Sequence, residues 1–147
     1  MDARRFIELV PDAERIWAAR LAEAWGYPRA ISEREVERGI WFRFSDGSGI
    51  AWLLEPHPDW AGLLAPGVPA LVWHGIGSPA ARKRRARVLS PRTAAFVEGY
   101  AESLGAQRLY SLVPDLTPGV PAAAMRRYLA RYGYVADKLG SYKDLGE

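Results

Sequence analysis

The sequence predicts a single α/β domain of the α+β kind, with a mixed, mostly antiparallel sheet flanked by about four helices. The chain has 147 residues, of which 49% are hydrophobic and 25% charged, so residues 1–147 are expected to fold as one globular unit. A strong hairpin pattern occupies its middle. Two helical segments then alternate with short strands, and such helical crossovers add parallel pairing to an antiparallel sheet.

The N-terminal third begins with a predicted strand and a predicted helix. Residues 6–10 are mostly apolar and favour a strand, and Pro11 after them suits a first helical turn. Apolar side chains then recur at helical spacing through residues 13–25. We expect Trp17 and Trp25 on this helix to complete the core beneath the sheet.

A capping pattern and a hairpin pattern follow. Ser32 and Glu35 have the spacing of a capping box, which opens a short second helix that ends near Gly39. The aromatic, β-branched segment Ile40–Phe44 and the apolar residues 50–54 are joined by a Ser-Asp-Gly-Ser-Gly turn. This arrangement is typical of a β-hairpin.

The second half of the chain alternates strands and helices. Residues 56–69 are rich in proline and predict a long connection with one helical turn at 60–64. A buried strand is expected over residues 70–76, closed by Gly-Ser-Pro.

Tryptophans fall on three successive predicted strands, where sheet packing is the simplest interpretation and an acceptor groove or protein interface is the alternative. They are Trp41, Trp52 and Trp73.

Two helices and the remaining strands are expected in the last third. Ser90 and Pro91 are a favourable N-cap and first-turn pair for a helix that ends at Gly105. Residues 109–113 predict a strand, and residues 125–133 predict a last helix. The chain from residue 134 onward supplies one or two terminal strands.

Composition excludes several classes of protein. The chain has no cysteine, which rules out disulfides and thiolate metal sites, and only two histidines, His57 and His74, so no metal site is expected. No segment approaches the ~18 apolar residues of a membrane span, and charged residues interrupt the N-terminus where a signal peptide would be apolar. These features predict a cytoplasmic or virion-associated protein.

A local block of positive charge is the sharpest compositional feature. The net charge is +3, but six bases without an acid lie within eleven residues: Arg82, Lys83, Arg84, Arg85, Arg87 and Arg92. This basic segment, residues 82–92, has three interpretations. It is a solvated loop, a surface that binds a protein or nucleic acid through salt-sensitive contacts, or a degenerate phosphate site.

The order of elements resembles that of the GNAT superfamily of N-acetyltransferases. The local match runs from a Leu-Gly-Ala-Gln-Arg-Leu-Tyr segment at residues 104–110 to Tyr-Leu-Ala-Arg-Tyr-Gly-Tyr at residues 128–134. It is similar to the family's ending of helix, glycine, strand, helix and a glycine–aromatic pair. The resemblance implies a fold in which one strand splays from its neighbour, with acetyl-CoA in the gap.

The resemblance also implies a glycine-rich loop whose backbone amides hold the pyrophosphate of the cofactor. The corresponding residues here are 87–92, with Arg87 at the start and Ser90 and Arg92 at the glycine positions. Pro91 removes one amide altogether. Arg87, Ser90 and Arg92 therefore form at best a degenerate acetyl-CoA site, and no cofactor is expected unless the chain is active.

A second departure concerns the family's usual acid, a tyrosine four residues before the glycine of the final pair. Leu129 stands there, and Tyr128 and Tyr132 point to either side of it on a helix. Together with the basic segment, this pattern resembles the GNAT-like internal virion proteins of T7-type bacteriophages. That branch implies a structural or binding role, with other virion or host proteins as partners.

Catalytic candidates are few. If the chain is active, Glu55 or His74 is the candidate base and Tyr128 the candidate acid. The simpler interpretations are a surface carboxylate for Glu55, a hydrogen-bonded cleft or core residue for His74, and core packing for Tyr128. His57, between two prolines, is expected to be a loop residue.

Three functions follow from these features. The first is a GNAT-fold protein that has lost acetyl transfer and acts as a structural or binding component of a bacteriophage virion. The second is a divergent acetyl-CoA-dependent N-acetyltransferase. The third is a nucleic-acid-binding module that uses the basic segment, with its partner surface at Arg82, Lys83, Arg84, Arg85 and Arg87.

Overall fold

The structure, a computed structural model, describes residues 7–27, 29–83, 91–111, 127, 129–136 and 141–145. The strands are β1 Ile7–Leu9, β2 Ile40–Phe44, β3 Gly49–Leu54, β4 Ala70–Gly77, β5 Arg108–Ser111, β6 Val135–Ala136 and β7 Ser141–Asp144. The helices are α1 Arg15–Ala24, α2 Glu33–Arg38, α3 Pro79–Lys83 and α4 Pro91–Ser103, with 3-10 segments η1 Asp12–Glu14 and η2 Pro58–Leu63.

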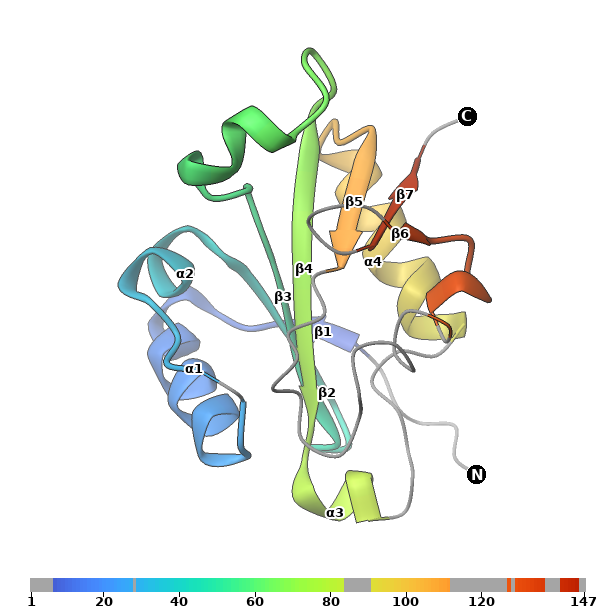
Figure 1. Ribbon diagram of the computed structural model, residues 1–147. Helices are drawn as coiled ribbons and strands as arrows, with labels where there is room; N and C mark the ends of the chain where they lie inside the picture. The colour runs from blue at the N-terminus through green and yellow to red at the C-terminus, as the bar shows by residue number, and fades with distance from the viewer. Residues whose placement is uncertain are drawn as a thin grey trace.

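Within the described residues, all strands belong to one sheet in the order β1-β2-β3-β4-β5-β7-β6 (Figure 1). Neighbouring strands are antiparallel except β4 and β5, which run parallel because α4 returns the chain between them. The mixed, mostly antiparallel sheet expected from the sequence is confirmed. The parallel pair among the described strands lies at the first of the two predicted helical crossovers, whereas the strands after the second, β6 and β7, pair antiparallel.

The β2–β3 hairpin forms at the turn predicted for residues 45–49. Gly47 has a φ of +75°, a left-handed conformation that costs glycine little. The Asp46 carboxylate accepts a hydrogen bond from the Ser48 backbone amide at 2.9 Å. The resulting register places Trp41 opposite Trp52, whose rings stack with centroids 4.4 Å apart.

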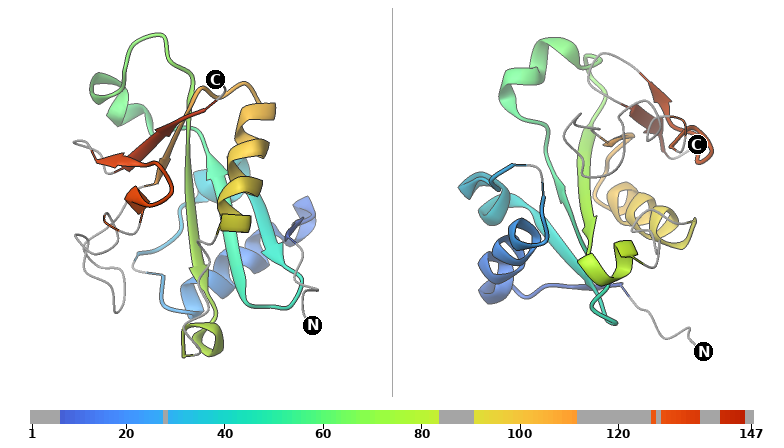
Figure 2. Two further views of the ribbon diagram at one scale, coloured as in Figure 1. Left: turned by 90° about the vertical axis from the view of Figure 1, so that its right-hand side faces the viewer. Right: turned by 60° about the horizontal axis from the view of Figure 1, so that its bottom comes forward.

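Two hydrophobic cores lie on opposite faces of the sheet (Figure 2). Alternation along β3 sends Ile50 and Trp52 to the face covered by α1 and α2, and Ala51 and Leu53 to the face covered by α4. Every residue of β3 is therefore buried. The three strand tryptophans are all at least 95% buried, which confirms their interpretation as sheet packing.

One expectation for the first helix was wrong. Helix α1 packs on the sheet through Ala18, Ala19 and Ala22, which are fully buried. Trp17 lies about 100° around the helix from Ala18 and is 49% exposed, so it does not complete the core. Trp25, by contrast, is partly buried and packs against the core on this face.

Helix α3 is an element that the sequence pattern did not predict. Pro79 was expected to close the preceding strand, but it occupies the first position of this short helix, where its missing N–H costs nothing. The Ser78 hydroxyl accepts a hydrogen bond from the Ala81 amide at 3.1 Å and so caps the helix. Arg82 and Lys83 lie in its last turn.

The C-terminal part confirms two short terminal strands, β6 and β7. Leu129 is fully buried and Gly133 has a φ of +90°, as expected near the end of a helix. Residues 125, 126 and 128 of the predicted last helix, and with them the candidate acid Tyr128, lie outside the described residues.

Candidate functional site

Among the described residues, β4 pairs with β5 over only the first half of its length. The two strands pair from Ala70 with Arg108 to Trp73 with Ser111. On its other side β4 pairs with β3 as far as Gly77. Within the described part of the chain, residues 74–77 therefore have no strand partner on the β5 side. Unpaired backbone amides and carbonyls along a strand are ready to bind an extended ligand.

His74 is the first residue of this unpaired stretch. Its side chain lies on the α1/α2 face, where the ring is 5.3 Å from Trp52 between centroids. The Nδ1 atom is 3.0 Å from the hydroxyl of Tyr27, which follows α1. Burial lowers the pKa of His74 to about 4, with a smaller contribution from the nearby Arg29 charge, so the imidazole is neutral at pH 7.

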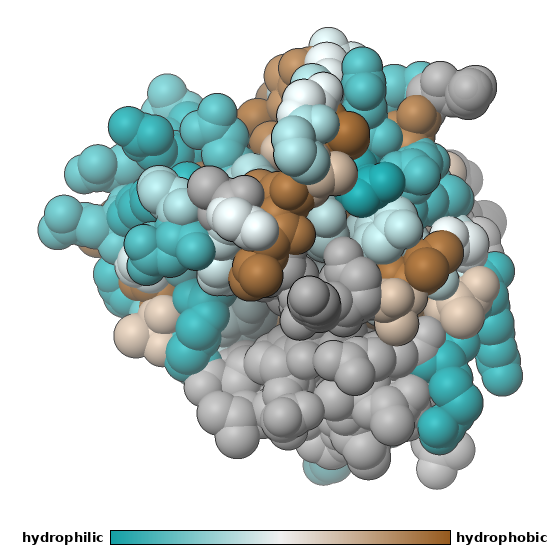
Figure 3. All heavy atoms as spheres, turned by 45° about the horizontal axis from the view of Figure 1, so that its top comes forward, coloured by the Kyte–Doolittle hydropathy of each residue, from teal (hydrophilic) through white to brown (hydrophobic). Residues whose placement is uncertain are grey.

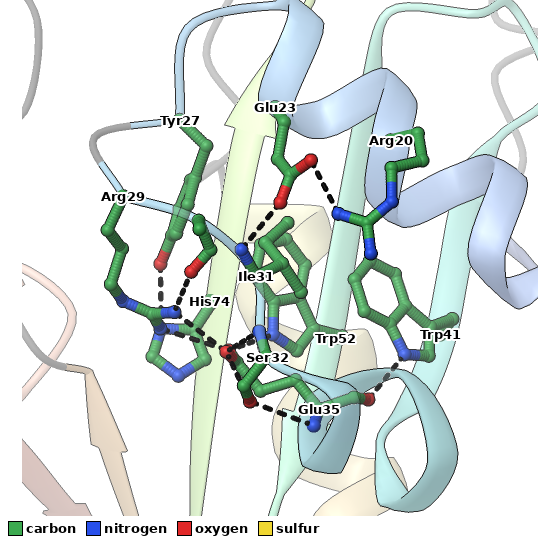
Figure 4. A network of polar contacts seen from close by, with 11 residues as sticks. Arg20, Glu23, Tyr27, Arg29, Ile31, Ser32, Glu35, Trp41, Trp52 and His74 are labelled. Atoms are coloured by element: carbon green, nitrogen blue, oxygen red, sulfur yellow. Dashed lines mark hydrogen bonds and ion pairs between the residues drawn. The ribbon is translucent and has the colours of Figure 1, made fainter.

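Beside His74, a buried carboxylate organises a polar network (Figure 4). Glu35 is 5% exposed and accepts two hydrogen bonds from Arg29, at 2.7 and 2.9 Å. The Trp52 indole donates to it at 3.0 Å, and the Ser32 backbone amide completes the capping box at 3.0 Å. Burial alone raises the pKa of Glu35, but these donors outweigh it and hold the pKa at about 2.

The same network joins α1, α2 and the sheet. The Glu35 carbonyl accepts a hydrogen bond from the Trp41 indole at 2.9 Å, which ties α2 to β2. Glu23 on α1 accepts from the Ile31 amide at 2.6 Å and so fixes the connection between the two helices. Burial raises the pKa of Tyr27 to about 12, so its phenol stays protonated and can donate to His74.

The two candidate bases, Glu55 and His74, lie in different environments. Glu55 follows β3, and its side chain is 71% exposed and 3.9 Å from the Arg38 guanidinium, as fits a surface carboxylate. His74 on β4 is instead in hydrogen-bond contact with Tyr27. His57 lies in a loop, as expected, where its Nδ1 accepts a hydrogen bond from the Asp59 amide. Tyr128, the candidate acid, lies outside the described residues.

Only part of the basic segment can be placed. Arg82 donates to the Gly77 carbonyl at 2.8 Å and to the Trp25 carbonyl at 2.7 Å, so it ties α3 to β4 and to the end of α1. Lys83 and Arg92 are exposed to solvent. The other predicted partner and cofactor residues, Arg84, Arg85, Arg87 and Ser90, lie outside the described residues.

Helix α4 begins at Pro91, with Arg92 in its second position. The helix start that the sequence predicts is thus confirmed. Its first residue carries no amide hydrogen. The positive end of the helix dipole lies at this start, but it offers one backbone donor fewer than a glycine-rich start would.

No group of three or more histidine, aspartate or glutamate residues comes together as a metal site among the described residues. No helix in that part of the chain is long and apolar enough to cross a membrane. Apolar side chains lie among hydrophilic ones on the face that Figure 3 shows.

Sequence reasoning missed three members of the network around His74. Glu35 was recognised only as a capping residue, because the capping pattern gives no sign that the carboxylate is buried. Tyr27 and Arg29 lie in the short connection between α1 and α2, where no periodicity assigns a direction to a side chain. The signal that the sequence did offer for this site was His74, a histidine within a strand that was expected to be buried.

Comparison with known proteins supports the fold alone. No protein-family model matches the chain, and no curated protein matches it. A GNAT-family acetyltransferase from Staphylococcus aureus Mu50 superposes with a TM-score of 0.60 and 8% identity, over 97% of this chain and 99% of that one. The ribosomal-protein-S5-alanine acetyltransferase from Vibrio fischeri gives 0.58 and 9%, over 98% and 91%. The chain therefore has the GNAT acetyltransferase fold.

Proposed function

We propose that the chain is a GNAT-fold protein that has lost acetyl transfer and acts as a binding or structural component of a bacteriophage virion. The observation that carries the proposal is the start of α4 at Pro91. The resemblance to GNAT proteins implies that the pyrophosphate of acetyl-CoA would bind at this helix start. A proline without an amide hydrogen, followed by an arginine side chain, is a poor substitute for glycine amides there.

The candidate bases support the same proposal. A general base for an amine needs a basic lone pair that the substrate can reach. The Nδ1 atom of His74 is engaged by Tyr27, and its pKa of about 4 makes the imidazole a weak base. Glu55 lies exposed in an ion pair with Arg38 rather than in a cleft.

The bacteriophage role is supported by the sequence resemblance to internal virion proteins and by the basic segment, residues 82–92. Six positive charges in eleven residues suit a partner surface for virion or host proteins, or for nucleic acid. Mass spectrometry of purified particles should detect the chain at a fixed copy number. Its absence from the particles would contradict the virion role.

The second candidate function is a divergent acetyl-CoA-dependent N-acetyltransferase. One observation favours it: among the described residues β4 pairs with β5 only as far as Trp73, and the resemblance implies a cofactor in a gap between two such strands. Under this alternative Arg87, Ser90 and Arg92 hold acetyl-CoA, and His74 takes the proton of the acceptor amine.

Release of free thiol from acetyl-CoA distinguishes the two functions. The chain contains no cysteine, so a thiol reagent reports only the CoA that is released. With a panel of amines and peptides, we expect no release above the uncatalysed rate. Release that depends on the enzyme concentration and disappears in His74→Leu would establish the transferase instead.

A restored loop provides the matched control. The triple variant Ser90→Gly, Pro91→Ala, Arg92→Gly returns amides and small residues to the helix start, while Gly62→Ala changes an unrelated site with open space around it. We expect the triple variant to bind acetyl-CoA more tightly than the parent chain, because it regains backbone donors. Equal affinity of both variants would show that the loop does not limit binding.

A further inference from the structure

Three buried polar atoms on the α4 side of the sheet have no hydrogen-bond partner among the described residues. They are the indole Nε1 of Trp73, the hydroxyl of Tyr134 and the Oε2 atom of Glu98. Trp73 and Tyr134 are each 5% exposed and belong to the same hydrophobic core. Most buried polar atoms in folded proteins bind another protein group or an ordered water, so three exceptions on one side of the sheet need a common explanation.

The ion pair of Glu98 with Lys143 brings α4 to the segment that contains Tyr134. The Lys143 Nζ atom, on β7, donates to the Oε1 atom of Glu98 at 3.1 Å. The Lys143 side chain passes Gly133, the residue before Tyr134, because its Cε lies 3.3 Å from the position that a Cβ of Gly133 would take. Lys143 uses one oxygen of Glu98, and the other is the buried atom without a partner.

Both Glu98 and Trp73 act on the hydroxyl of Tyr134. Burial raises the pKa of Tyr134, the negative charge of Glu98 raises it further, and the indole N–H of Trp73 lowers it. The phenol is therefore protonated, so its oxygen can both donate and accept. Yet these three groups, all in the described part of the chain, make no hydrogen bond to one another through the three buried atoms.

The chemistry of the three groups selects a small neutral molecule as their common partner. The indole nitrogen can only donate, and a carboxylate oxygen can only accept. A cation would face the indole hydrogen of Trp73, and an anion would face the carboxylate of Glu98. Water can accept from two donors and donate to an acceptor, and buried waters in proteins make about three hydrogen bonds of this kind.

We propose that one buried water molecule accepts hydrogen bonds from the Trp73 indole and the Tyr134 hydroxyl and donates one to Oε2 of Glu98. The water joins helix α4 to β4 and to the residue that precedes β6. It links them at Trp73, the last residue of β4 that pairs with β5 among the described residues. The site lies in the core beneath α4, so it is present whether or not the chain transfers acetyl groups.

Nuclear Overhauser contacts with water test the site in the intact chain. A ¹⁵N-labelled sample gives an indole signal for each of the six tryptophans. Trp41 serves as the internal control, since it is 1% exposed and its indole donates to the Glu35 carbonyl at 2.9 Å. We expect a contact with long-lived water at the Trp73 indole proton and none at that of Trp41. Absence of the contact at Trp73, or equal contacts at both indoles, would overturn the proposal.

A hydroxyl proton that exchanges with solvent can imitate such a contact. Tyr134→Phe removes that route and leaves the water two partners, Trp73 and Glu98, which are enough to hold it. We expect the water contact at Trp73 to persist in this variant, while an unchanged Trp41 indole signal shows that the fold is intact. Loss of the contact at Trp73 in Tyr134→Phe would assign it to the hydroxyl and refute the bound water.

A crystal structure of the full chain gives an independent answer that does not depend on any variant. We expect one ordered water at about 2.7–3.2 Å from Nε1 of Trp73, the hydroxyl of Tyr134 and Oε2 of Glu98. Direct hydrogen bonds from Trp73 to Tyr134 and from Tyr134 to Glu98, with no water between them, would contradict the proposal.

Discussion

Replacing Glu35 with glutamine is expected to lower the free energy of unfolding by about 2–3 kcal/mol at pH 7. The folded chain holds the pKa of this carboxyl at about 2, against an ordinary value of 4.5. A difference of that size corresponds to at most about 3 kcal/mol of preferential stabilisation of the charged form. The lower value, about 2 kcal/mol, allows for screening of the Glu35–Arg29 ion pair by water, because the Arg29 side chain is 46% exposed.

The assay is urea denaturation followed by tryptophan fluorescence, with Glu33→Gln as the control. Glu33 is also a glutamate in the first turn of α2, so the same substitution can be made there, but its side chain is exposed. The parent protein should lose this stability as the pH falls from 4.5 to 2, since the unfolded chain binds the proton first. Glu35→Gln should lack that dependence. Equal stabilities of the two variants would refute the assignment of Glu35 as a buried charge held by its donors.

Three further predictions concern the surroundings of the site. The unfolded chain binds a proton at the ordinary His74 value of 6.5, and the folded chain only near 4, so stability should fall as the pH drops from 6.5 to 4. Urea titrations should show a smaller slope in this window for His74→Gln, and an unchanged slope would contradict the buried neutral imidazole. Gly39→Ala should cost about 2 kcal/mol or more, because a Cβ there collides with the Glu35 carbonyl and lies 2.8 Å from the Trp41 indole nitrogen. Gly99→Ala in α4, with open space around it, should instead stabilise the protein by about 0.5–1 kcal/mol, and thermal melts of the two variants should therefore move in opposite directions. Arg82→Ala should cost about 1 kcal/mol through the loss of its two carbonyl contacts, whereas exposed Lys83→Ala should stay within about 0.5 kcal/mol. Equal losses of stability in Arg82→Ala and Lys83→Ala would argue against a stabilising contact of Arg82 between α3 and the end of α1.

Local patterns were sufficient to predict most of the fold. The capping box at Ser32, the hairpin turn at Gly47 and the helix start at Pro91 depend on short-range geometry, and each lies where the sequence indicated. Trp17 shows the limit of periodicity. Its helix buries three alanines instead, because small residues let the helix approach the sheet closely, and this choice depends on the opposite surface.

The site was much less predictable than the fold. The hydrogen-bond contact of His74 is made with Tyr27, which lies 47 residues away along the chain. No short-range pattern links these positions. The burial of Glu35 likewise depends on the Trp52 indole from the neighbouring hairpin, a contact that exists only once the sheet and helix have packed.

A calorimetric titration of the full chain with acetyl-CoA tests the proposed loss of acetyl transfer most directly. We expect no heat of binding up to millimolar cofactor, because Pro91 lacks the backbone N–H that a glycine would offer to a phosphate at the start of α4. Micromolar binding that disappears in Arg87→Ala with Arg92→Ala would contradict the proposal and identify a working cofactor site.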